Sequence, residues 1–399
     1  MKNSLNTSWL PMCKAMDTRI NYLPKHSSFS HPASAANAQG FSIVELLIAV
    51  TIGLIILSGV INVVVKSKTN KMQQDEVAFI QDNARFVVET LTSEIRMAGY
   101  MGCASPTTSL IANSIDGNFF NFVGTGGIEG YDGQTSVAGF PSPLNTLAKV
   151  GSDAFIVRRG DSDELGVESH VAASATISLY KQHSFPPGTP LMIADANCRY
   201  VGLFQVSSPN ANALPANKIV HNTGAVTSNC TKIIRGSFVC TPSCTAVSCN
   251  GYGTTTGSYS PGSKVMRFIS RAYFIGPSTV MADMPALKRQ SLVMDSTLTT
   301  RSEEIAQGVE DMQLLYGVDT NADGDVNQYR TAAQMDVDGS GAIDGKDWDK
   351  VKSVRISLVF RSQNPVAPSN QTQVINGVTY NDRYLRQAVN STVVIRNRM

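Results

Sequence analysis

Oxygen-bearing residues between Asp336 and Asp347 have the spacing of a twelve-residue calcium loop. In such a loop, positions 1, 3, 5, 9 and 12 supply oxygen ligands, position 7 supplies a backbone carbonyl, and position 6 is a glycine, here Gly341. The alternative is a solvated acidic turn, because Asp and Gly favour turns. The ligands that the spacing predicts are Asp336, Asp338, Ser340, Ala342, Asp344 and Asp347.

A second acidic segment, which starts at Asp319, follows the same pattern less completely. Its twelfth position is Arg330, so a calcium ion here would need another ligand from elsewhere in the chain. Extracellular calcium modules bind the ion with a Kd of about 0.1–1 mM. Calcium at either segment is therefore expected to stabilise the local fold and not to act as a signal. The predicted ligands of the second segment are Asp319, Asn321, Asp323 and Asp325.

One charge, Glu45, lies within an apolar run from Phe41 to Val65. Such a run can span a bilayer, since a spanning helix needs about 20 mostly apolar residues. A carboxylate inside the span costs roughly 2.5 kcal/mol or more to insert, so it indicates a function. If the chain is cut after Gly40, the new amino group of Phe41 lies one helical turn from Glu45. An ammonium and a carboxylate then share one end of an apolar helix.

Six of the seven cysteines follow the apolar run. An even number fits an oxidising compartment such as the periplasm, where disulfides persist. Zinc sites need paired spacings such as Cys-x2-Cys, which this set does not match well. The sequence therefore predicts disulfides, with a disulfide loop at 230–249 and a long-range link through Cys103. The six residues are Cys103, Cys198, Cys230, Cys240, Cys244 and Cys249.

Charge and motif content argue against a nucleic-acid-binding protein and against an enzyme. The chain has 33 Lys and Arg against 31 Asp and Glu, without the basic cluster that nucleic acid requires. It lacks the His-Glu-x-x-His, Gly-x-Ser-x-Gly and P-loop motifs. His170, His183 and His221 are expected at the surface or in loops, and Tyr259 in a glycine-rich loop. Trp348 is expected to anchor the acidic loop that precedes it.

A long helix is predicted to begin in the apolar run and to continue beyond it. Apolar and small residues recur at three- and four-residue steps, which gives one face of this helix an apolar stripe. Gly99 and Gly102 are expected to end the helix, and Gly53 and Gly59 to weaken it within the apolar half. The stripe consists of Ile80, Ala84, Val87, Leu91, Ile95 and Ala98.

These patterns predict an α+β protein, in which a long N-terminal helix packs on a mainly antiparallel β head. We expect a leader at 1–40, the helix at 41–100 with 41–65 in the membrane, and the head at 101–399. The head contains the acidic loops, at 319–347.

Short β-branched runs separated by Ser, Thr, Gly and Asn mark the strands of the head. Segments 222–262 and 362–379 lack such runs and are expected to form loops. The predicted strands are 154–158, 176–180, 191–194, 203–206, 264–275, 313–318, 354–360 and 391–396.

The string Gly40-Phe41-Ser42 with Glu45 and Leu46, directly before an apolar run, resembles the class III signal of type IV prepilins. The resemblance implies that prepilin peptidase cuts between Gly40 and Phe41 and methylates the new amino group. It also implies that Glu45 neutralises the amino terminus of a neighbouring subunit during assembly. The alternative is an ordinary membrane anchor.

The first 40 residues differ from the usual prepilin leader, which is short and has a basic residue close to the glycine. Here the last basic residue before the cut is Lys25. Met12 or Met16, instead of Met1, would give a shorter leader. The Ala-Asn-Ala string at 36–38 looks like a signal-peptidase site, but it precedes the apolar run instead of following it.

Further segments resemble PilW-type minor pilins, so that the resemblance extends from residue 40 to 398. It implies a minor pilin that helps to start type IV pilus assembly, and hence twitching motility, with other minor pilins, the major pilin and a tip adhesin. It also implies a single inner-membrane span with a periplasmic head that later joins the pilus at the cell surface. The alternatives are a minor pseudopilin of a type II secretion system and a pilus-tip module that binds a surface or DNA. The segments are 84–88, 96–103, 308–319, 354–358 and 396–398.

Overall fold

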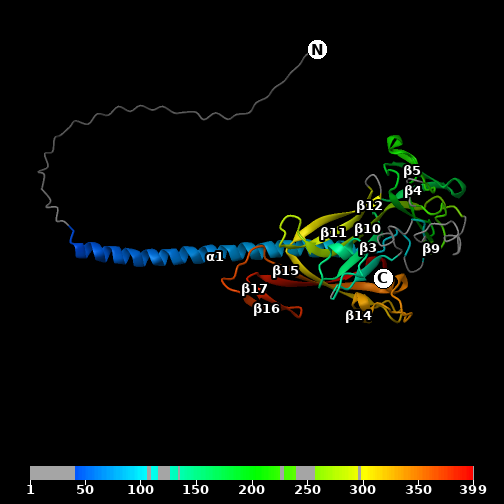
Figure 1. Cartoon of the computed structure of the whole chain (residues 1–399). Coiled ribbons are helices and arrows are strands. Elements are labelled where there is room, and N and C mark those ends of the chain that lie inside the picture. Colours follow the sequence, from blue (N-terminus) through cyan, green and yellow to red (C-terminus); the bar gives the residue numbers. More distant parts are fainter. Residues whose placement is uncertain are drawn as a thin grey trace, which may run out of the picture. The chain divides into compact units, whose positions relative to one another are not determined.

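The protein consists of two units, which divide between Val64 and Val65. Helix α1 (Ile43–Arg96) supplies residues to both, and the strands all belong to the second unit (Figure 1). The computed structural model describes residues 41–105, 109–115, 126–133, 135–224, 229–239, 257–294 and 298–398.

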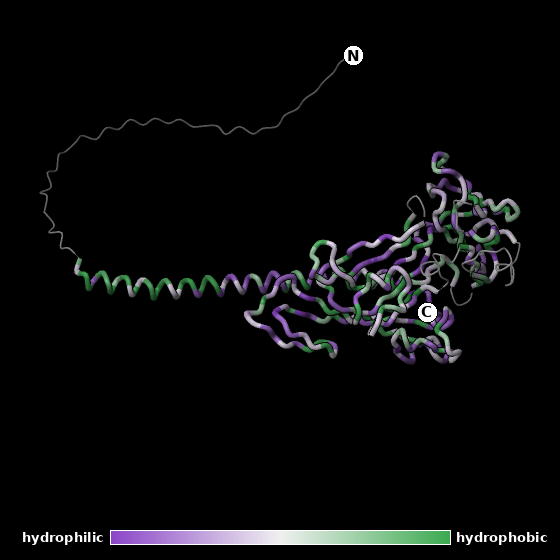
Figure 2. The backbone as a smooth tube through the Cα atoms, in the orientation of Figure 1, coloured by the Kyte–Doolittle hydropathy of each residue, from purple (hydrophilic) through white to green (hydrophobic). Residues whose placement is uncertain are grey.

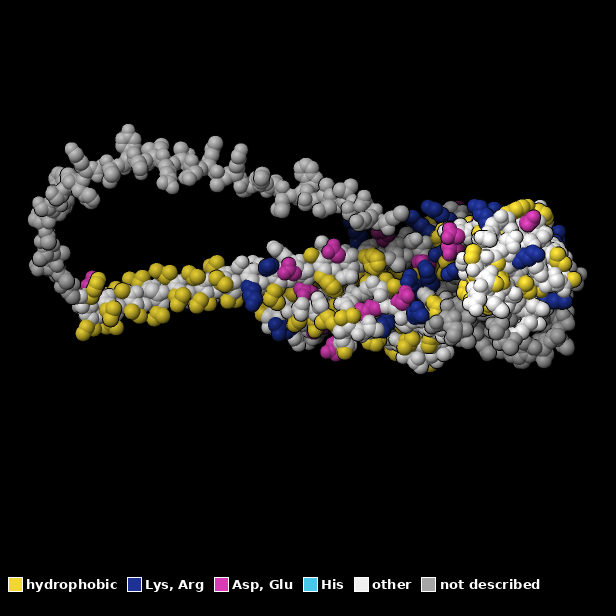
Figure 3. All heavy atoms as spheres, turned by 90° about the horizontal axis from the view of Figure 1, so that it is seen from above, with side chains coloured by type: hydrophobic (Ala, Val, Ile, Leu, Met, Phe, Trp, Pro, Cys, Tyr) yellow, Lys and Arg dark blue, Asp and Glu magenta, His cyan; other side chains and the backbone are white. Residues whose placement is uncertain are grey.

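In the first unit, the side chains of α1 are exposed on every face from Phe41 to Val64. Figure 2 colours most of this part of the helix as hydrophobic, and Figure 3 shows hydrophobic side chains along it. Within the described residues, α1 is the one helix long and apolar enough to cross a membrane. Ser42 caps it, because its Oγ accepts a hydrogen bond from the Val44 N–H at 3.3 Å. The helix is unbroken at Gly53 and Gly59, so the weakening expected there does not interrupt it.

In the second unit, one face of α1 is buried against the head. All six residues of the predicted stripe are buried. They share a core with Met312 and Leu314 of β13 (Val309–Val318) and with Ile356 and Leu358 of β15 (Val351–Arg361). Burying a Val, Leu or Ile side chain contributes about 1.5–3 kcal/mol, so this seam holds the helix to the head. The helix ends before Gly99, whose φ of 71° is the left-handed conformation expected after a helix end.

The larger sheet of the head is mainly antiparallel. Its described strands follow the order β8-β5-β4-β10-β6-β7-β1-β9, and β10 also pairs with β3 and β11, which pair in turn with β2 and β12. Only the pairs that β1 makes with β7 and β9 are parallel among those described. The strands are β1 (Leu110–Asn113), β2 (Ile128–Tyr131), β3 (Ala154–Gly160), β4 (Leu165–Val171), β5 (Thr176–His183), β6 (Pro190–Ala194), β7 (Tyr200–Gln205), β8 (Ala216–Val220), β9 (Phe238–Val239), β10 (Lys264–Pro277), β11 (Pro285–Met294) and β12 (Leu298–Gln307).

A second, four-stranded sheet has the order β14-β13-β15-β18, with β14 at Gln328–Arg330 and β18 at Arg386–Val394. Strands β16 (Gln371–Ile375) and β17 (Val378–Asp382) form a separate hairpin. The short helices are α2 (Leu144–Leu147), α3 (Gly345–Trp348) and the 3-10 turns η2 (Ala172–Ser174), η3 (Ala211–Ala213), η4 (Ala332–Gln334) and η5 (Arg396–Arg398).

The α+β class and the predicted strands are confirmed, with three differences. The segment 222–262, expected to be loop, contains the short strand β9. The strand expected at 391–396 is β18, which begins earlier and ends at Val394, because Arg396 lies in η5. The loop expected at 362–379 is wrong in part, because β16 and the first two residues of β17 lie in it. The turn between them is Asn376-Gly377, with φ angles of 53° and 80°. That dipeptide is a strong hairpin signal in the sequence.

Candidate functional site

The N-terminal motif places Phe41 and Glu45 at the start of an exposed apolar helix. Phe41 is 83% exposed, and Glu45 lies in the first turn of α1. The positive end of the helix dipole favours a carboxylate in that turn. Gly40, the predicted cleavage residue, lies outside the described residues.

Three of the predicted calcium ligands converge in the loop 336–347. Oxygens of Asp336, Asp338 and Asp347 all lie within 4.8 Å of one another. Asp336 Oδ1 is shielded from solvent and has no hydrogen-bond partner in the part of the chain that the structure describes. Three like charges at this separation repel one another, and oxygen ligands suit a hard divalent cation. The carboxylates therefore fit a calcium ion.

The side chain of Asp347 organises this loop by accepting hydrogen bonds from the loop's backbone N–H groups. The residue is fully buried, and its Oδ1 accepts hydrogen bonds from the N–H groups of Val337 (2.8 Å) and Asp338 (3.1 Å). Its Oδ2 accepts from the Asp344 N–H at 3.0 Å. One carboxylate thus closes the two ends of the loop onto each other before any cation is considered.

The other three predicted ligands have different partners. Asp344 caps α3, and its Oδ1 accepts from the Lys346 N–H at 2.7 Å. Ser340 Oγ donates to the Ala342 carbonyl at 3.0 Å, so these two oxygens bond to each other. Hydrogen bonding by Ser340 also holds the pKa of Asp338 below its usual value. Half of the predicted set converges, and half stabilises the turn.

Trp348 anchors the loop as predicted. Its side chain is 4% exposed and meets the Tyr316 ring edge to face at 4.9 Å between centroids. Both residues belong to the core that contains the α1 stripe. The acidic loop is therefore attached to the centre of the second unit.

The second acidic segment is held by hydrogen bonds and by an internal cation. Asp319 Oδ2 accepts from the Gly324 N–H at 2.9 Å and lies 3.8 Å from Lys352 Nζ. Asp323 accepts from Asn321 Nδ2 and from the Asp325 N–H, each at 2.9 Å. Within the described residues, these acids do not form a three-carboxylate group like that of the first loop. Asp319 Oδ1 is nevertheless shielded and has no hydrogen-bond partner among them.

Two buried acids on α1 were missed by the sequence reasoning. Glu76 accepts hydrogen bonds from the N–H groups of Gln363 (2.6 Å) and Asn364 (3.2 Å) and from Asn364 Nδ2 (2.7 Å). Glu94 pairs with Arg271 and lies 3.6 Å from Arg159. Both glutamates follow the three- and four-residue steps of the apolar stripe, and that spacing was the signal available in the sequence.

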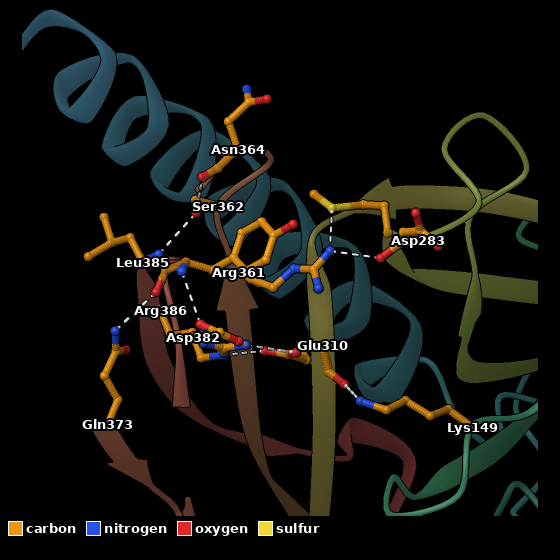
Figure 4. A network of polar contacts seen from close by, with 12 residues as sticks. Lys149, Asp283, Glu310, Arg361, Ser362, Asn364, Gln373, Asp382, Leu385 and Arg386 are labelled. Carbon is orange, nitrogen blue, oxygen red and sulfur yellow. Dashed lines mark hydrogen bonds and ion pairs between the residues drawn. The ribbon is translucent and has the colours of Figure 1, made fainter. Parts of the chain in front are cut away.

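A buried ion network fixes the start of β18 (Figure 4). Arg386 Nε lies 2.5 Å from Glu310 of β13, and Arg386 Nη2 lies 2.7 Å from Asp382 of β17. Hydrogen bonding from Arg386 lowers the pKa of Asp382. Lys149 Nζ also donates to the Glu310 carbonyl at 2.7 Å. The network joins the hairpin, β13 and β18.

The long-range disulfide through Cys103 is confirmed. Cys103 bonds to Cys198, 95 residues later in the sequence. It links the segment after α1 to the turn between β6 and β7. Cys230 is also disulfide-bonded. The other predicted members, Cys240, Cys244 and Cys249, lie outside the described residues, as does most of the predicted loop 230–249.

The expectation that the histidines lie at the surface or in loops holds only for His221, which lies in the loop after β8. His170 lies in β4 and His183 in β5. His170, His183 and His221 are buried. His170 Nδ1 accepts from the N–H of Tyr259, also buried, so its neutral ring carries the proton on Nε2 and donates to His221 Nε2 at 3.0 Å. Burial lowers the pKa of His170 to about 4 and that of His221 to about 3. His170 and His183 lie at buried positions of their strands, and His221 is buried just after β8. The amino-acid composition does not reveal which side of a strand a residue faces.

Two family models match the chain. Residues 272–397 match the family described as Type IV Pilus-assembly protein W, and residues 35–61 match the prokaryotic N-terminal methylation motif. Comparisons with curated proteins and with solved structures give no significant match. The matches confirm the PilW and prepilin resemblances, although over fewer residues than the sequence blocks suggested, since 84–88 and 96–103 lie outside both.

The methylation motif and the apolar part of α1 fit a pilin anchored in the inner membrane. Pilin-type matches point to a structural protein that interacts with pilus components and with prepilin peptidase. The chain is therefore similar to type IV pilus-related pilins: it matches the PilW family over residues 272–397 and the prepilin methylation motif over residues 35–61.

Proposed function

We propose that this pilin is a minor subunit that helps to initiate type IV pilus assembly. It acts in a priming complex with other minor pilins, the major pilin and a tip adhesin, and its head is periplasmic before assembly. The observation that carries the proposal is the PilW match to the C-terminal part of the head, residues 272–397, together with the methylation motif at the start of the apolar helix. The PilW match favours a pilus over a type II secretion pseudopilus.

Processing at Gly40 is the first step to test. Mass spectrometry of the protein from cells should give a chain that begins at N-methylated Phe41, and Gly40→Val should retain the leader. A terminus near Ala38, which a signal peptidase would leave, would contradict the proposed processing.

Glu45 supplies the charge for assembly. An exposed carboxylate in the first turn of α1 can pair with the amino terminus of another subunit, and Glu45 belongs to a different unit from the head. Glu45→Ala should reduce incorporation into pili and leave the melting of the head unchanged. Asp82→Ala, another exposed acid on α1, is the control and should assemble normally. Normal piliation with Glu45→Ala would argue against the pairing role.

Calcium is proposed as a structural ion of the head, with the loop 336–347 as the better site. The three convergent carboxylates and the unpartnered Asp336 Oδ1 support this proposal. When bound, the ion would neutralise the repulsion among these carboxylates. The segment that starts at Asp319 is the weaker candidate, because Lys352 already supplies a positive charge there.

A further inference from the structure

Strand β18 forms one edge of the four-stranded sheet. It pairs with β15 over nine consecutive residue pairs, from Arg361–Arg386 to Ser353–Val394, and the register has no bulge. Among the described residues, no strand pairs with its other side. An edge strand of this length presents a row of backbone N–H and C=O groups that can pair with another chain.

The β18 edge lacks the features that usually protect such strands. Natural edges carry charged residues, proline or bulges, or are very short. Residues 387–394 read Gln-Ala-Val-Asn-Ser-Thr-Val-Val, without charge or proline, and the one charge of the strand, Arg386, is buried in the ion network. The opposite edge, β14, has three residues, and β12 carries Arg301, Glu303 and Glu304. Of these three edges, β18 is therefore the one that is both long and unprotected against pairing with another chain.

A groove of about 630 Å³ runs between α1 and this strand. Val88 of α1 and Val389 of β18 give it an apolar floor. Its charged side chains are Arg85, Glu89, Arg96 and Arg396, three positive and one negative. The groove therefore offers an apolar surface, a net positive rim and a free strand edge together.

We propose that β18 accepts an extended segment of a different protein chain, which adds a strand to the sheet and lies in the groove along α1. Main-chain hydrogen bonds to the edge would supply affinity, and alternate side chains would supply specificity. The segment would place apolar side chains on Val88 and Val389 and acidic side chains near the arginines.

The charge of the groove decides between a partner and a second copy. Pairing two β18 edges would bring two positive rims together, which like charges disfavour. An acidic segment of another protein would be attracted instead.

The spacing of two arginines sets the spacing of acids in that segment. Arg85 and Arg96 are separated by about 17 Å along the helix, at 1.5 Å per residue. A strand covers that span in about five residues, so the acids should lie four to six positions apart.

The test uses fluorescein-labelled peptides and the full chain in detergent. The matching probe is Glu-Thr-Val-Thr-Val-Thr-Glu, which has two glutamates and two valines on one face. The controls are the same peptide with lysines for glutamates and one with proline for the central threonine. Fluorescence anisotropy should show binding of the glutamate peptide, at least tenfold weaker binding of the lysine peptide, and none of the proline peptide.

Protein variants place the binding in the groove. Arg85→Glu with Arg96→Glu should reverse the preference between the glutamate and lysine peptides, because both arginines are exposed on α1. Lys181→Glu makes the same charge change at an exposed position of β5 and should have no effect. Amide hydrogen exchange of the unmodified chain should slow in β18 when the glutamate peptide binds, a measurement that needs no variant.

Three outcomes would overturn the proposal: equal binding of all peptides, no binding at millimolar peptide, or protection of β18 by self-association without peptide. The proposal rests on the edge and the groove alone. A failure of strand addition would therefore leave the proposed role in pilus assembly intact, and a failure of that role would leave strand addition intact.

Discussion

The two acidic loops have nearly the same spacing of oxygen ligands, but they are completed in different ways. In the loop 336–347, a buried carboxylate, Asp347, occupies position 12 and closes the turn through three backbone N–H groups. In the segment that starts at Asp319, Arg330 occupies position 12, and the ammonium of Lys352 lies 3.8 Å from Asp319. One loop gathers carboxylates, and the other has its counter-charge within the chain.

This difference shows that the ligand spacing alone does not define a cation site. Spacing brings oxygens to one turn, but the groups that complete the turn decide whether their charge stays uncompensated. Asp347 adds a carboxylate to one loop, and Lys352 adds an ammonium to the other. A protein that supplies its own cation loses the need for an external one. The comparison leads to four predictions, in order of decreasing effect.

Asp347→Ala should cause the largest loss of stability. It removes the acceptor of three N–H groups in a buried turn, and hydrogen bonds to charged groups are each worth about 1.5–3 kcal/mol. We expect a loss of about 3 kcal/mol or more in denaturant unfolding. Asp347→Asn keeps one acceptor oxygen and should lose about half as much. Equal stability of the Ala variant and the unmodified protein would contradict the organising role of Asp347.

Asp336→Ala should abolish the stabilisation by calcium. If the Kd is near 0.5 mM, 5 mM calcium stabilises the native protein by about 1.4 kcal/mol through mass action. Thermal unfolding with calcium and with chelator measures this gain. Asp325→Ala, an exposed acid of the other segment, should keep it. A gain that survives Asp336→Ala but disappears with Asp325→Ala would reverse the ranking of the two loops.

Lys352→Met should make the second segment resemble the first. Removing the ammonium leaves the largely buried Asp319 without its counter-charge, at a cost of about 1 kcal/mol that calcium would partly restore. Asp319→Asn in the same background should cancel most of that loss, because the charge is then gone. No change in calcium response on losing Lys352 would show that the internal cation does not exclude calcium.

Acidification should remove the calcium effect only at low pH. A lowered pKa in the folded state contributes stability above the unfolded value and loses it as pH falls through the folded value. Because the pKa of Asp338 lies below the usual 3.8, the loop should keep this ligand charged at pH 4. Calcium titrations at pH 7, 4 and 3 should show loss of the gain below pH 4. Loss already at pH 5 would contradict this expectation, because it would require ligands whose pKa is raised above the ordinary value for Asp.

Much of the fold follows from local patterns in the sequence. The helix, its stripe and its stop at Gly99 depend on periodicity and on one glycine, which a single sequence displays. The strand of Val354, Ile356 and Leu358 shows the alternation of a sheet with one buried face. The pairing order of the strands depends on contacts between distant segments, and no local pattern encodes it.

The candidate site was predictable only in part for the same reason. The spacing identified Asp336, Asp338 and Asp347, which converge. It could not show that Asp344 caps a helix or that Ser340 bonds Ala342, because these are choices among local hydrogen bonds. Ile343, which is apolar at position 8 of the loop, is 44% exposed. The buried Glu76 shows that an apolar stripe can include an acid, provided that backbone N–H groups donate hydrogen bonds to its carboxylate.

The Cys103–Cys198 bond has a consequence for mechanical load. A pull that overcomes the packing of α1 on the head passes along the chain to Cys103, and the covalent link passes that force directly to the β6–β7 turn. The chain between the two cysteines, which are separated by 95 positions, is then bypassed. At about 3.5 Å per extended residue, roughly 330 Å of chain cannot be drawn out while the bond is intact. An oxidised head would therefore resist stretching as a short tether, and a reduced head would lengthen under the same tension.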